Sequence, residues 1–427
     1  FIIRIKSPGS FFNKIKVTDL VKGTMEMPEN DMALNMLGAI YCDALAQYDK
    51  AEEMFDRVIE LVPNADITMR NKAIVYRKAG KFDKVAQQYK FVAEKFPKLK
   101  TSYLNYVSYK TDITAEEALK FFAGYEGWPS DERLQALMLG DAIDTEVMTA
   151  KTLESFLAYY EGLIEKYPDD YYLLYHKTQL LQGLERYEEA LAACEQAAEI
   201  SGVMSYYATN ALGNLYYAMG NYENAIACYG DNVMAHNDNS LRLCMADCYI
   251  SMADYVGMEQ VLTDYLAEGG EEADAASYRM KAAYLQENYE ALLTYADMVI
   301  AEDNRDAKAK AYKVVAMREL DMEGTDELIA EIDSQGFSAE SLTLMTINSI
   351  LGRFDEAREI YAVMQEHAPG VAITCKNNYE LKNLYTDAAF CEMAGMECKA
   401  VEIAGTEQTV AEAKTEAVNE QATQEAN

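Results

Sequence analysis

Proline, histidine and tryptophan are scarce in this chain of 427 residues, which holds 7 prolines, 3 histidines and 1 tryptophan. Few prolines leave long stretches in which a helix is not interrupted. Cys244 and Cys248 stand one helical turn apart, but a structural zinc site needs four ligands, and the three histidines are too widely separated in the sequence to complete one. We therefore expect no metal and no cofactor.

Long apolar runs and the common catalytic motifs are also missing. No stretch of 18 apolar residues is present, so nothing in the sequence predicts a membrane span. The patterns GxxxxGK[ST], GxGxxG, HExxH and GxSxG do not occur. Adjacent acids such as Glu188 and Glu189 point apart on a helix and form solvated faces rather than acid–base pairs. The sequence predicts a protein that is not an enzyme and has no small-molecule substrate.

Cysteine use and the chain start bear on the cellular location. Cys194 and Cys228 fall where small apolar side chains would pack, which predicts buried thiols and a reducing compartment. No signal peptide is recognisable, so we expect a cytoplasmic protein. The chain begins with Phe1 rather than methionine, which leaves open a missing leader or anchor and a membrane-associated location.

Only the first quarter of the chain carries a net positive charge. Residues 1–110 carry 18 Lys and Arg against 13 Asp and Glu, which leaves 20 against 58 in the remainder, and the net charge is −33. Two interpretations stay open: the acidic body keeps the protein soluble, or it selects basic partners. Nucleic acid is not an expected partner, because its binding needs a positive surface.

An aromatic residue after a turn recurs with a spacing near 34 residues. In the stretch 211–229, ALGNLYYAMGNYENAIACY, apolar positions follow the helical period, break at Gly220 and restart at Tyr222. Two copies of this aromatic marker are degraded between Phe82 and Tyr187, and one copy is degraded between Tyr289 and Phe354. A period near 34 predicts stacked helical hairpins from about residue 32 to 370. The aromatic markers are Tyr48, Phe82, Tyr187, Tyr222, Tyr255, Tyr289 and Phe354.

The repeat resembles the tetratricopeptide repeat family, and the resemblance spans most of the chain. The family pattern is a small residue and a tyrosine in the first helix, a glycine turn, an aromatic, an alanine, an aromatic and a proline. The resemblance implies an all-α right-handed superhelix of about eleven hairpins, in a protein expected to be bacterial. The best match is Gly213, Tyr216, Gly220, Tyr222, Ala225 and Tyr229.

Three parts are expected along the chain: a basic N-terminal extension at 1–31, a solenoid at 32–403, and an acidic disordered tail at 404–427. The extension is either a cap on the first hairpin or a basic amphipathic segment for an anionic membrane, which is the only membrane contact the sequence offers. Near the end of the solenoid, residues 373–402 form a final hairpin or a single capping helix.

Within the solenoid, the pattern is worn at 100–168. Thr114 and Glu117 have the spacing of a capping box and predict the start of a helix. Trp128, next to Pro129, is expected to plug an irregular junction rather than to bind a ligand. This worn stretch is a candidate for a bend or a boundary between sub-domains.

The family resemblance also implies a partner-binding groove, because first helices line the concave face. Amide and phenol side chains there suit an extended peptide. Asn210 and Asn214 resemble the amide part of a carboxylate clamp, although Asp247 stands where it would repel an anion. Arg70, Arg77 and Lys78 either hold an acidic peptide or form a solvated face. The other groove positions are Tyr172, Tyr175, Gln179, Tyr207 and Tyr217.

The expected function is a non-catalytic scaffold or adaptor that binds a peptide or helix of a partner protein on the concave face. The alternative is a component of a membrane or envelope assembly that is tethered through the N-terminal segment. An enzyme accessory protein is the third interpretation.

Overall fold

The computed structural model describes residues 30–201 and 206–398, and the described residues form helices and turns without a strand. The predicted N-terminal extension and C-terminal tail lie almost wholly outside these ranges. The helices of the first half are α2 (Asp31–Asp43), α3 (Tyr48–Leu61), α4 (Asp66–Lys78), α5 (Phe82–Lys95), α6 (Lys100–Tyr109), α7 (Ala115–Phe122), α8 (Glu132–Gly140), α9 (Ala150–Lys166), α10 (Tyr171–Gly183) and α11 (Tyr187–Ser201).

The second half continues the same alternation of first and second helices. Its ten long helices are α12 (Tyr206–Ala218), α13 (Tyr222–His236), α14 (Leu241–Ser251), α15 (Tyr255–Ala267), α16 (Glu272–Leu285), α17 (Tyr289–Glu302), α18 (Ala307–Glu319), α19 (Thr325–Asp333), α20 (Leu342–Leu351) and α21 (Phe354–His367). The chain then forms α22 (Pro369–Thr374), the 3₁₀ turns η2 (Cys375–Asn377), η3 (Tyr379–Leu381) and η4 (Leu384–Thr386), and α23 (Ala388–Ala394).

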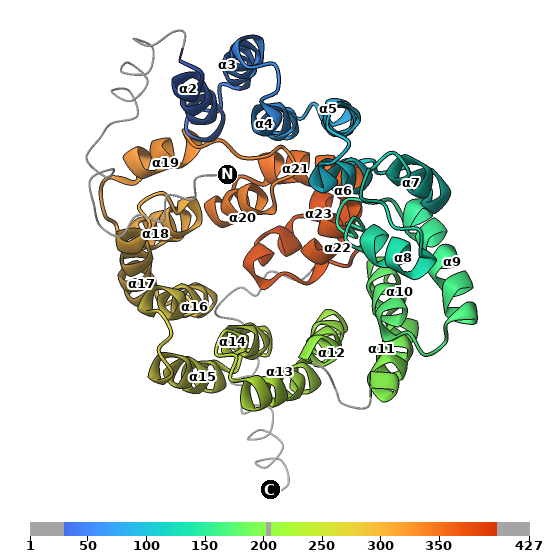
Figure 1. The fold of residues 1–427 in the computed structure, drawn as a ribbon. Helices are drawn as coiled ribbons and strands as arrows, with labels where there is room; N and C mark the ends of the chain where they lie inside the picture. Colours follow the sequence, from blue (N-terminus) through green and yellow to red (C-terminus); the bar gives the residue numbers. More distant parts are fainter. Residues whose placement is uncertain (1–29, 202–205, 399–427) are drawn as a thin grey trace, which may run out of the picture.

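Helices α2 to α21 pair as ten successive hairpins that stack side by side in an arc, which confirms the predicted all-α superhelix (Figure 1). Each of the seven aromatic markers is the first residue of a second helix, α3, α5, α11, α13, α15, α17 or α21. The three degraded markers correspond to α7, α9 and α19, which begin with Ala115, Ala150 and Thr325. The period near 34 residues therefore continues through the worn stretches.

Small residues in first helices admit the large aromatics of second helices. A Cβ atom on Gly213 would stand 2.6 Å from the Tyr229 ring, and one on Gly38 would stand 2.6 Å from the Phe55 ring. These distances are too short for any side chain, so both glycines are required by the close crossing of the two helices in a hairpin.

Turns inside several of the hairpins share one backbone geometry. Within two residues of the end of the first helix, the backbone is left-handed at Gly80, Gly220 and Gly352, with φ of 67°, 74° and 75°, and equally so at Glu287, with φ of 56°. In each turn the next amide donates back to the carbonyl five residues earlier, as Asn288 N does to Ala283 O at 2.9 Å. The stacking of hairpins therefore imposes the turn even where the sequence does not supply glycine.

Glu287→Gly should stabilise the chain, because glycine adopts a left-handed conformation without strain. We expect the free energy of unfolding to rise by about 0.5 to 1 kcal/mol. This is the net of two effects: relief of backbone strain stabilises the folded chain, and the greater backbone entropy of glycine stabilises the unfolded chain by a smaller amount. The same substitution three residues later, Glu290→Gly, falls inside α17 and should lower it by about 1 kcal/mol. Urea denaturation of both variants measures the difference, and equal effects would contradict a strained turn.

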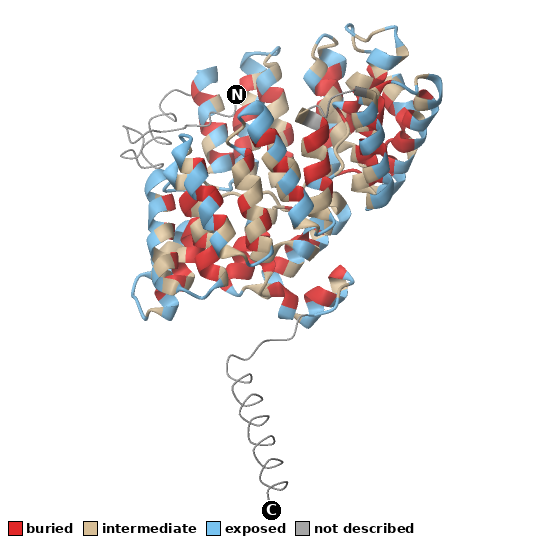
Figure 2. Ribbon diagram, turned by 90° about the horizontal axis from the view of Figure 1, so that it is seen from below, coloured by how far each residue is buried: buried red, intermediate tan, exposed pale blue. Residues whose placement is uncertain are grey.

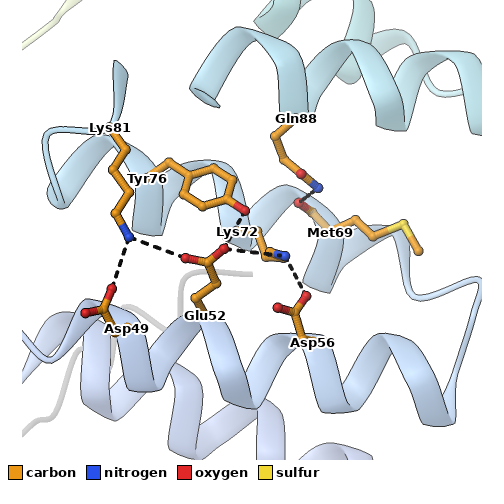
Figure 3. A network of polar contacts seen from close by, with 8 residues as sticks. All are labelled: Asp49, Glu52, Asp56, Met69, Lys72, Tyr76, Lys81 and Gln88. Atoms are coloured by element: carbon orange, nitrogen blue, oxygen red, sulfur yellow. Dashed lines mark hydrogen bonds and ion pairs between the residues drawn. The ribbon is translucent and has the colours of Figure 1, made fainter. Parts of the chain in front are cut away.

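Polar contacts bind the first two hairpins to each other (Figure 3). Glu52 of α3 accepts a hydrogen bond from the Tyr76 hydroxyl of α4 at 2.8 Å and lies 3.9 Å from Lys72 Nζ. Burial alone raises the pKa of Glu52, but the Tyr76 hydroxyl and the charges of Lys72 and Lys81 bring it below its ordinary value. Much of the basic charge of the second hairpin thus neutralises acids of the first.

The worn stretch at 100–168 contributes much of the largest group of contiguous buried side chains, which extends on into α12. Thr114 and Glu117 form the predicted capping box at the start of α7. The Trp128 ring stacks on Phe122 with ring centroids 4.9 Å apart, so it fills the junction as predicted. Across the molecule, buried residues line the faces where neighbouring helices meet, while turns are exposed (Figure 2).

The two ends of the arc meet and close the superhelix into a ring (Figure 1). The Tyr48 hydroxyl donates to the Phe337 carbonyl at 3.0 Å, and the Phe82 and His367 rings stack with centroids 4.0 Å apart. Arg77 of α4 forms an ion pair with Glu340, which precedes α20. These contacts join hairpins that are eight or nine repeats apart in the sequence.

The segment after α21 turns into the interior of the ring, where α22 and α23 lie in Figure 1. Leu381, Leu384 and Phe390 are fully buried against α20 and α21, so the segment covers the last hairpin as a cap made of several short helices. Cys391 and Cys398 form a disulfide at its end. In the described part of the chain, no helix is both long and apolar enough to cross a membrane.

Candidate functional site

A cavity of about 630 Å³ is lined by residues of α8, the first half of α10, the second half of α11 and the start of α12. Leu134, Leu137 and Met138 of α8 form one wall. The tyrosines of α10 and Cys194 and Ala197 of α11 form further parts of the lining. The cavity therefore spans three successive hairpins rather than one. The α10 residues of the lining are Tyr171, Tyr172, Tyr175, His176 and Thr178.

Two aspartates place the walls of the cavity. Asp131 caps α8 by accepting hydrogen bonds from the backbone amides of Arg133 and Leu134, each at 3.0 Å. Asp170 caps α10 by accepting from the Tyr172 amide at 3.1 Å, and its other oxygen pairs with the Arg133 guanidinium. Because Asp170 is buried, this pair links the starts of the two helices and sets the separation of Leu134 from Tyr172.

His176 lies beneath the cavity and is packed too tightly to act as a base. A Cβ atom on Gly140 would stand 2.2 Å from its ring, and the Tyr160 ring centroid is 5.4 Å away. Burial lowers the pKa of His176, since a charged ring would lose its hydration. Its Nδ1 lies 3.1 Å from Gln179 Oε1, and Gln179 Nε2 donates to the Tyr175 hydroxyl at 3.2 Å. The histidine and glutamine thus orient Tyr175.

Cys194 is buried in the lining, and burial raises the pKa of its thiol to about 11. A thiol with such a pKa is protonated at neutral pH and is a poor nucleophile. Cys194 is buried, as predicted for a packing thiol, whereas Cys228 is half-buried. The cavity offers apolar contact rather than reactive groups.

The rim of the cavity combines exposed apolar side chains with acids. Leu134 is 53% exposed and Tyr172 is 47% exposed, although both are large apolar or aromatic residues. Asp131 and Asp169 are exposed on the loops before α8 and α10. Asp141, also in the lining, accepts from Lys100 Nζ at 2.9 Å. An apolar mouth bordered by carboxylates favours an apolar ligand that carries positive charge.

The predicted groove residues of α10 and α12 do not form one continuous surface. Tyr172 and Tyr175 line the cavity, with Gln179 directly behind them. In α12, Asn210 accepts from Asn232 Nδ2 at 2.6 Å, and Asn214 accepts from the Tyr229 hydroxyl at 2.8 Å. The α12 amides therefore brace the second helix of their own hairpin.

Two further tyrosines of α12 complete the predicted groove. Tyr217 packs edge to face on Tyr222, with ring centroids 5.4 Å apart, and burial raises its pKa. Tyr207 belongs to α12, but its side chain lies outside the described part of the structure.

The three predicted basic groove residues already have acidic neighbours. Arg70 pairs with Asp66 of its own helix at 3.0 Å, and Lys78 pairs with Asp43 of α2 at 2.7 Å. Arg77 pairs with Glu340 and donates to the Tyr109 hydroxyl at 3.0 Å. Their charges hold the chain's own elements together, and a bound acidic peptide would have to displace those partners.

The tetratricopeptide repeat family model matches residues 33–64 and 207–230. These ranges cover the hairpin α2/α3 and most of α12 and the start of α13, both within the ten stacked hairpins. These two segments of the chain are therefore similar to the tetratricopeptide repeat. Members of this family generally mediate protein–protein interactions through a fold that is typically non-catalytic.

Solved structures of tetratricopeptide repeat proteins resemble this chain at low identity. A protein from Parabacteroides merdae is 16% identical with a TM-score of 0.36, over 70% of this chain and 98% of its own. YrrB, described as having an unusual peptide-binding site, is 16% identical with a TM-score of 0.31, over 41% of this chain and 92% of its own. Yeast Tom70 is 10% identical with a TM-score of 0.33, over 86% of this chain and 99% of its own. No curated protein matches the chain.

Sequence reasoning missed the α8 part of the cavity lining. Leu134, Leu137 and Met138 lie in the worn stretch, where the family pattern gives no register for projecting side chains onto the concave face. The spacing of i, i+3 and i+4 marks them as one helical face. Nothing in that spacing distinguishes a face that lines a cavity from one that is fully packed.

Proposed function

We propose that this protein is a non-catalytic scaffold that binds a partner protein by receiving an apolar side chain of the partner in the cavity between α8, α10, α11 and α12. The observation that carries the proposal is an apolar cavity of about 630 Å³ with a rim of exposed Leu134 and Tyr172. A cavity of this size accepts a large side chain and part of its backbone. Interface hot spots are usually such pockets filled by an aromatic or aliphatic anchor.

The chemistry of the lining supports binding rather than turnover. The Cys194 thiol has a raised pKa, the pKa of His176 is lowered by burial, and both side chains are themselves packed. Tyr175 is held in place by Gln179 and presents a rigid ring, which gives contact area at a small entropic cost. A scaffold needs this kind of preformed surface, because affinity is lost when side chains must be ordered on binding.

Charge indicates the flanking residues of the partner segment. Asp141 lines the cavity, Asp131 and Asp169 are exposed on the loops before α8 and α10, and the net charge of the chain is −33. We therefore expect Lys or Arg to flank the anchor side chain. The negative charge of the acidic body attracts these residues and raises the association rate of the partner. This favours the interpretation of the acidic body as a selector of basic partners.

A peptide array tests the proposal with wild-type protein and two variants. Each 12-residue peptide carries one central Leu, Phe or Trp, flanked by Lys and Arg in one set and by Asp and Glu in the other. We expect wild type to prefer basic flanks and Leu134→Arg to weaken the bound peptides at least about tenfold, a loss of about 1.4 kcal/mol. Leu61→Arg is the matched control, since Leu61 is a 48% exposed leucine on α3, far from the cavity.

Two results would contradict the proposal. One is that Leu134→Arg and Leu61→Arg retain the same peptides with the same affinity, which would place binding elsewhere. The other is that no peptide with an apolar centre binds wild type at all. Circular dichroism of both variants confirms that they remain folded.

A further inference from the structure

The segment from η2 to η4, residues 375–386, has two chemically different faces. One face is apolar: Cys375, Leu381 and Leu384 are fully buried against Met345 and Met364 of α20 and α21. This face accounts for the capping of the last hairpin, which requires only that apolar surface be covered. The other face is polar and aromatic, and it points at first helices that lie across the ring.

The side chain of Tyr379 contacts residues of α14 and α16. Its hydroxyl donates to Asp247 Oδ1, and the Tyr278 hydroxyl donates to the other oxygen of Asp247 at 3.1 Å. Lys281 Nζ lies 3.8 Å from Asp247 and 6.0 Å from the centroid of the Tyr379 ring. Burial and the Asp247 charge raise the pKa of Tyr379 well above its usual value, so it remains a hydrogen-bond donor. The acid that disfavours a carboxylate clamp is therefore an acceptor for tyrosine.

Glu380 is received by α18. One carboxylate oxygen accepts from the Tyr312 hydroxyl at 2.8 Å, and Lys308 Nζ lies 3.1 Å from the carboxylate. The Glu380 side chain is only 12% exposed. Burial acts to raise its pKa, but the charges of Lys308 and Lys281 and the Tyr312 hydroxyl leave it below its ordinary value. Glu380 is therefore an ionised, fully partnered carboxylate inside the ring.

The next two polar residues of the segment both contact Tyr284 at the end of α16. Lys382 Nζ stands 4.4 Å from the centroid of the Tyr284 ring and donates to the Tyr284 carbonyl at 3.2 Å. Asn383 Nδ2 donates to the Tyr284 hydroxyl at 2.9 Å. Four polar side chains of the six-residue stretch 378–383 thus contact different groups on α14, α16 and α18, while the Asn378 side chain accepts a hydrogen bond from the Glu380 amide of its own segment.

We infer that the concave face of α14, α16 and α18 is a recognition site for an adjacent tyrosine and glutamate, and that residues 378–383 are its ligand, supplied by the chain itself. The receptor groups come from the first helices of three consecutive hairpins and match the ligand side chain by side chain. A cap alone does not need this match, since burying a carboxylate costs free energy that apolar contact would not.

The kind of partner that fits this site carries the same chemistry, a tyrosine next to a carboxylate in a tight turn. It must compete with a segment tethered at both ends to the same molecule, whose effective concentration is in the millimolar range or above. We therefore expect the wild-type chain to reject such a peptide and a chain with a weakened internal ligand to accept it. The inference uses no contact of the cavity at α8 and α10.

The experiment uses the full chain and a fluorescent peptide, acetylated and amidated, with the sequence of residues 378–383, NYELKN. We expect saturable binding by fluorescence anisotropy to the Tyr379→Ala/Glu380→Ala chain and none to wild type. A peptide with alanines in place of its tyrosine and glutamate should bind at least tenfold more weakly. Adding Lys308→Glu to the double-alanine chain should abolish binding, and a peptide with lysine in place of glutamate should restore it.

Amide hydrogen exchange shows whether the variant stays folded, because Leu381 and Leu384 still cap α20 and α21. If the amides of α20 and α21 lose protection from exchange in the double-alanine chain, the peptide titration is repeated with the milder Tyr379→Phe/Glu380→Gln chain. Absence of saturable binding to a variant with protected α20 and α21 overturns the inference. So does equal binding of both peptides, or a failure of the Lys308→Glu charge reversal to change specificity. None of these outcomes alters the test at Leu134, which lies on a different surface.

Discussion

Arg77→Met should weaken the contact between the two ends of the ring by about 3 to 5 kcal/mol. The substitution leaves the buried carboxylate of Glu340 without its partner. Glu340 is 5% exposed, and one of its carboxylate oxygens has no hydrogen-bond partner even with Arg77 in place. Amide hydrogen exchange of residues 336–341 measures the opening. Lys78→Met is the matched control, since Lys78 pairs with Asp43 at the surface and should matter by less than about 1 kcal/mol.

The same variant should be sensitive to pH in a defined direction. Burial raises the pKa of Asp144 and of Glu146, and Arg77 is a charge that opposes both rises. A carboxyl group whose folded pKa is raised favours the folded form at low pH and loses that contribution as the pH rises through the folded pKa. Arg77→Met lets the pKa values of both carboxyl groups rise further. We therefore expect the loss of folding free energy in this variant to become smaller as the pH falls from 7 toward about 4, the pKa of Asp and Glu in an unfolded chain.

A double variant separates the ion pair from the packing around it. Arg77→Met/Glu340→Gln removes both charges and should recover most of the protection lost by Arg77→Met alone, since no isolated charge remains. An Arg77→Met chain that keeps wild-type exchange at 336–341 would show that the ring is held by other contacts, such as the stack of Phe82 on His367.

Phe122→Ala is expected to give the largest loss in the hairpin stack, about 3 to 5 kcal/mol, because it empties a fully buried site. Phe122 is 0% exposed, stacks on Trp128 and packs near Tyr103 with ring centroids 6.0 Å apart. Each hairpin contacts mainly its neighbours, so the loss should be confined to the hairpins from α6 to α10. Hydrogen exchange resolved by segment measures this better than a single melting temperature.

Phe91→Ala provides the control for Phe122→Ala. Phe91 is 50% exposed on α5, so the same truncation should change the free energy of unfolding by less than about 0.5 kcal/mol. If both variants behave alike, the worn stretch is loosely packed and its aromatic cluster does not stabilise the solenoid. Loss of protection that extends to α16 and α18 would instead show that the ring unfolds as one unit.

The closed ring changes where partners can reach the concave face. Residues 378–383 occupy the face of α14, α16 and α18, whereas the cavity at α8 and α10 opens beside exposed Leu134. The described residues thus combine an apolar cavity beside exposed side chains with a concave face that the chain itself fills. The two proposals are tested on different helices, so each can fail without the other.

The sequence predicted those features that depend on contacts within a hairpin or with the next one. The seven aromatic markers and the capping box at Thr114 are found in the structure. Such features are encoded by residues fewer than about 35 positions apart, and each has a local physical cause, such as the unpaired backbone amides that a capping box satisfies at the start of a helix. The choice of Tyr172 and Tyr175 as neighbours on one face has the same origin.

Only the tertiary structure decided the features that join distant repeats. Arg77 meets Glu340 across 263 positions, and Tyr379 meets Asp247 across 132. Whether such residues meet depends on small rotations between successive hairpins, which add along the stack and are not written in any single repeat. By itself, then, the sequence determined a stack of helical hairpins, while the closure of the ring, the open cavity at α8 and the internal ligand arose from the accumulated curvature of that stack.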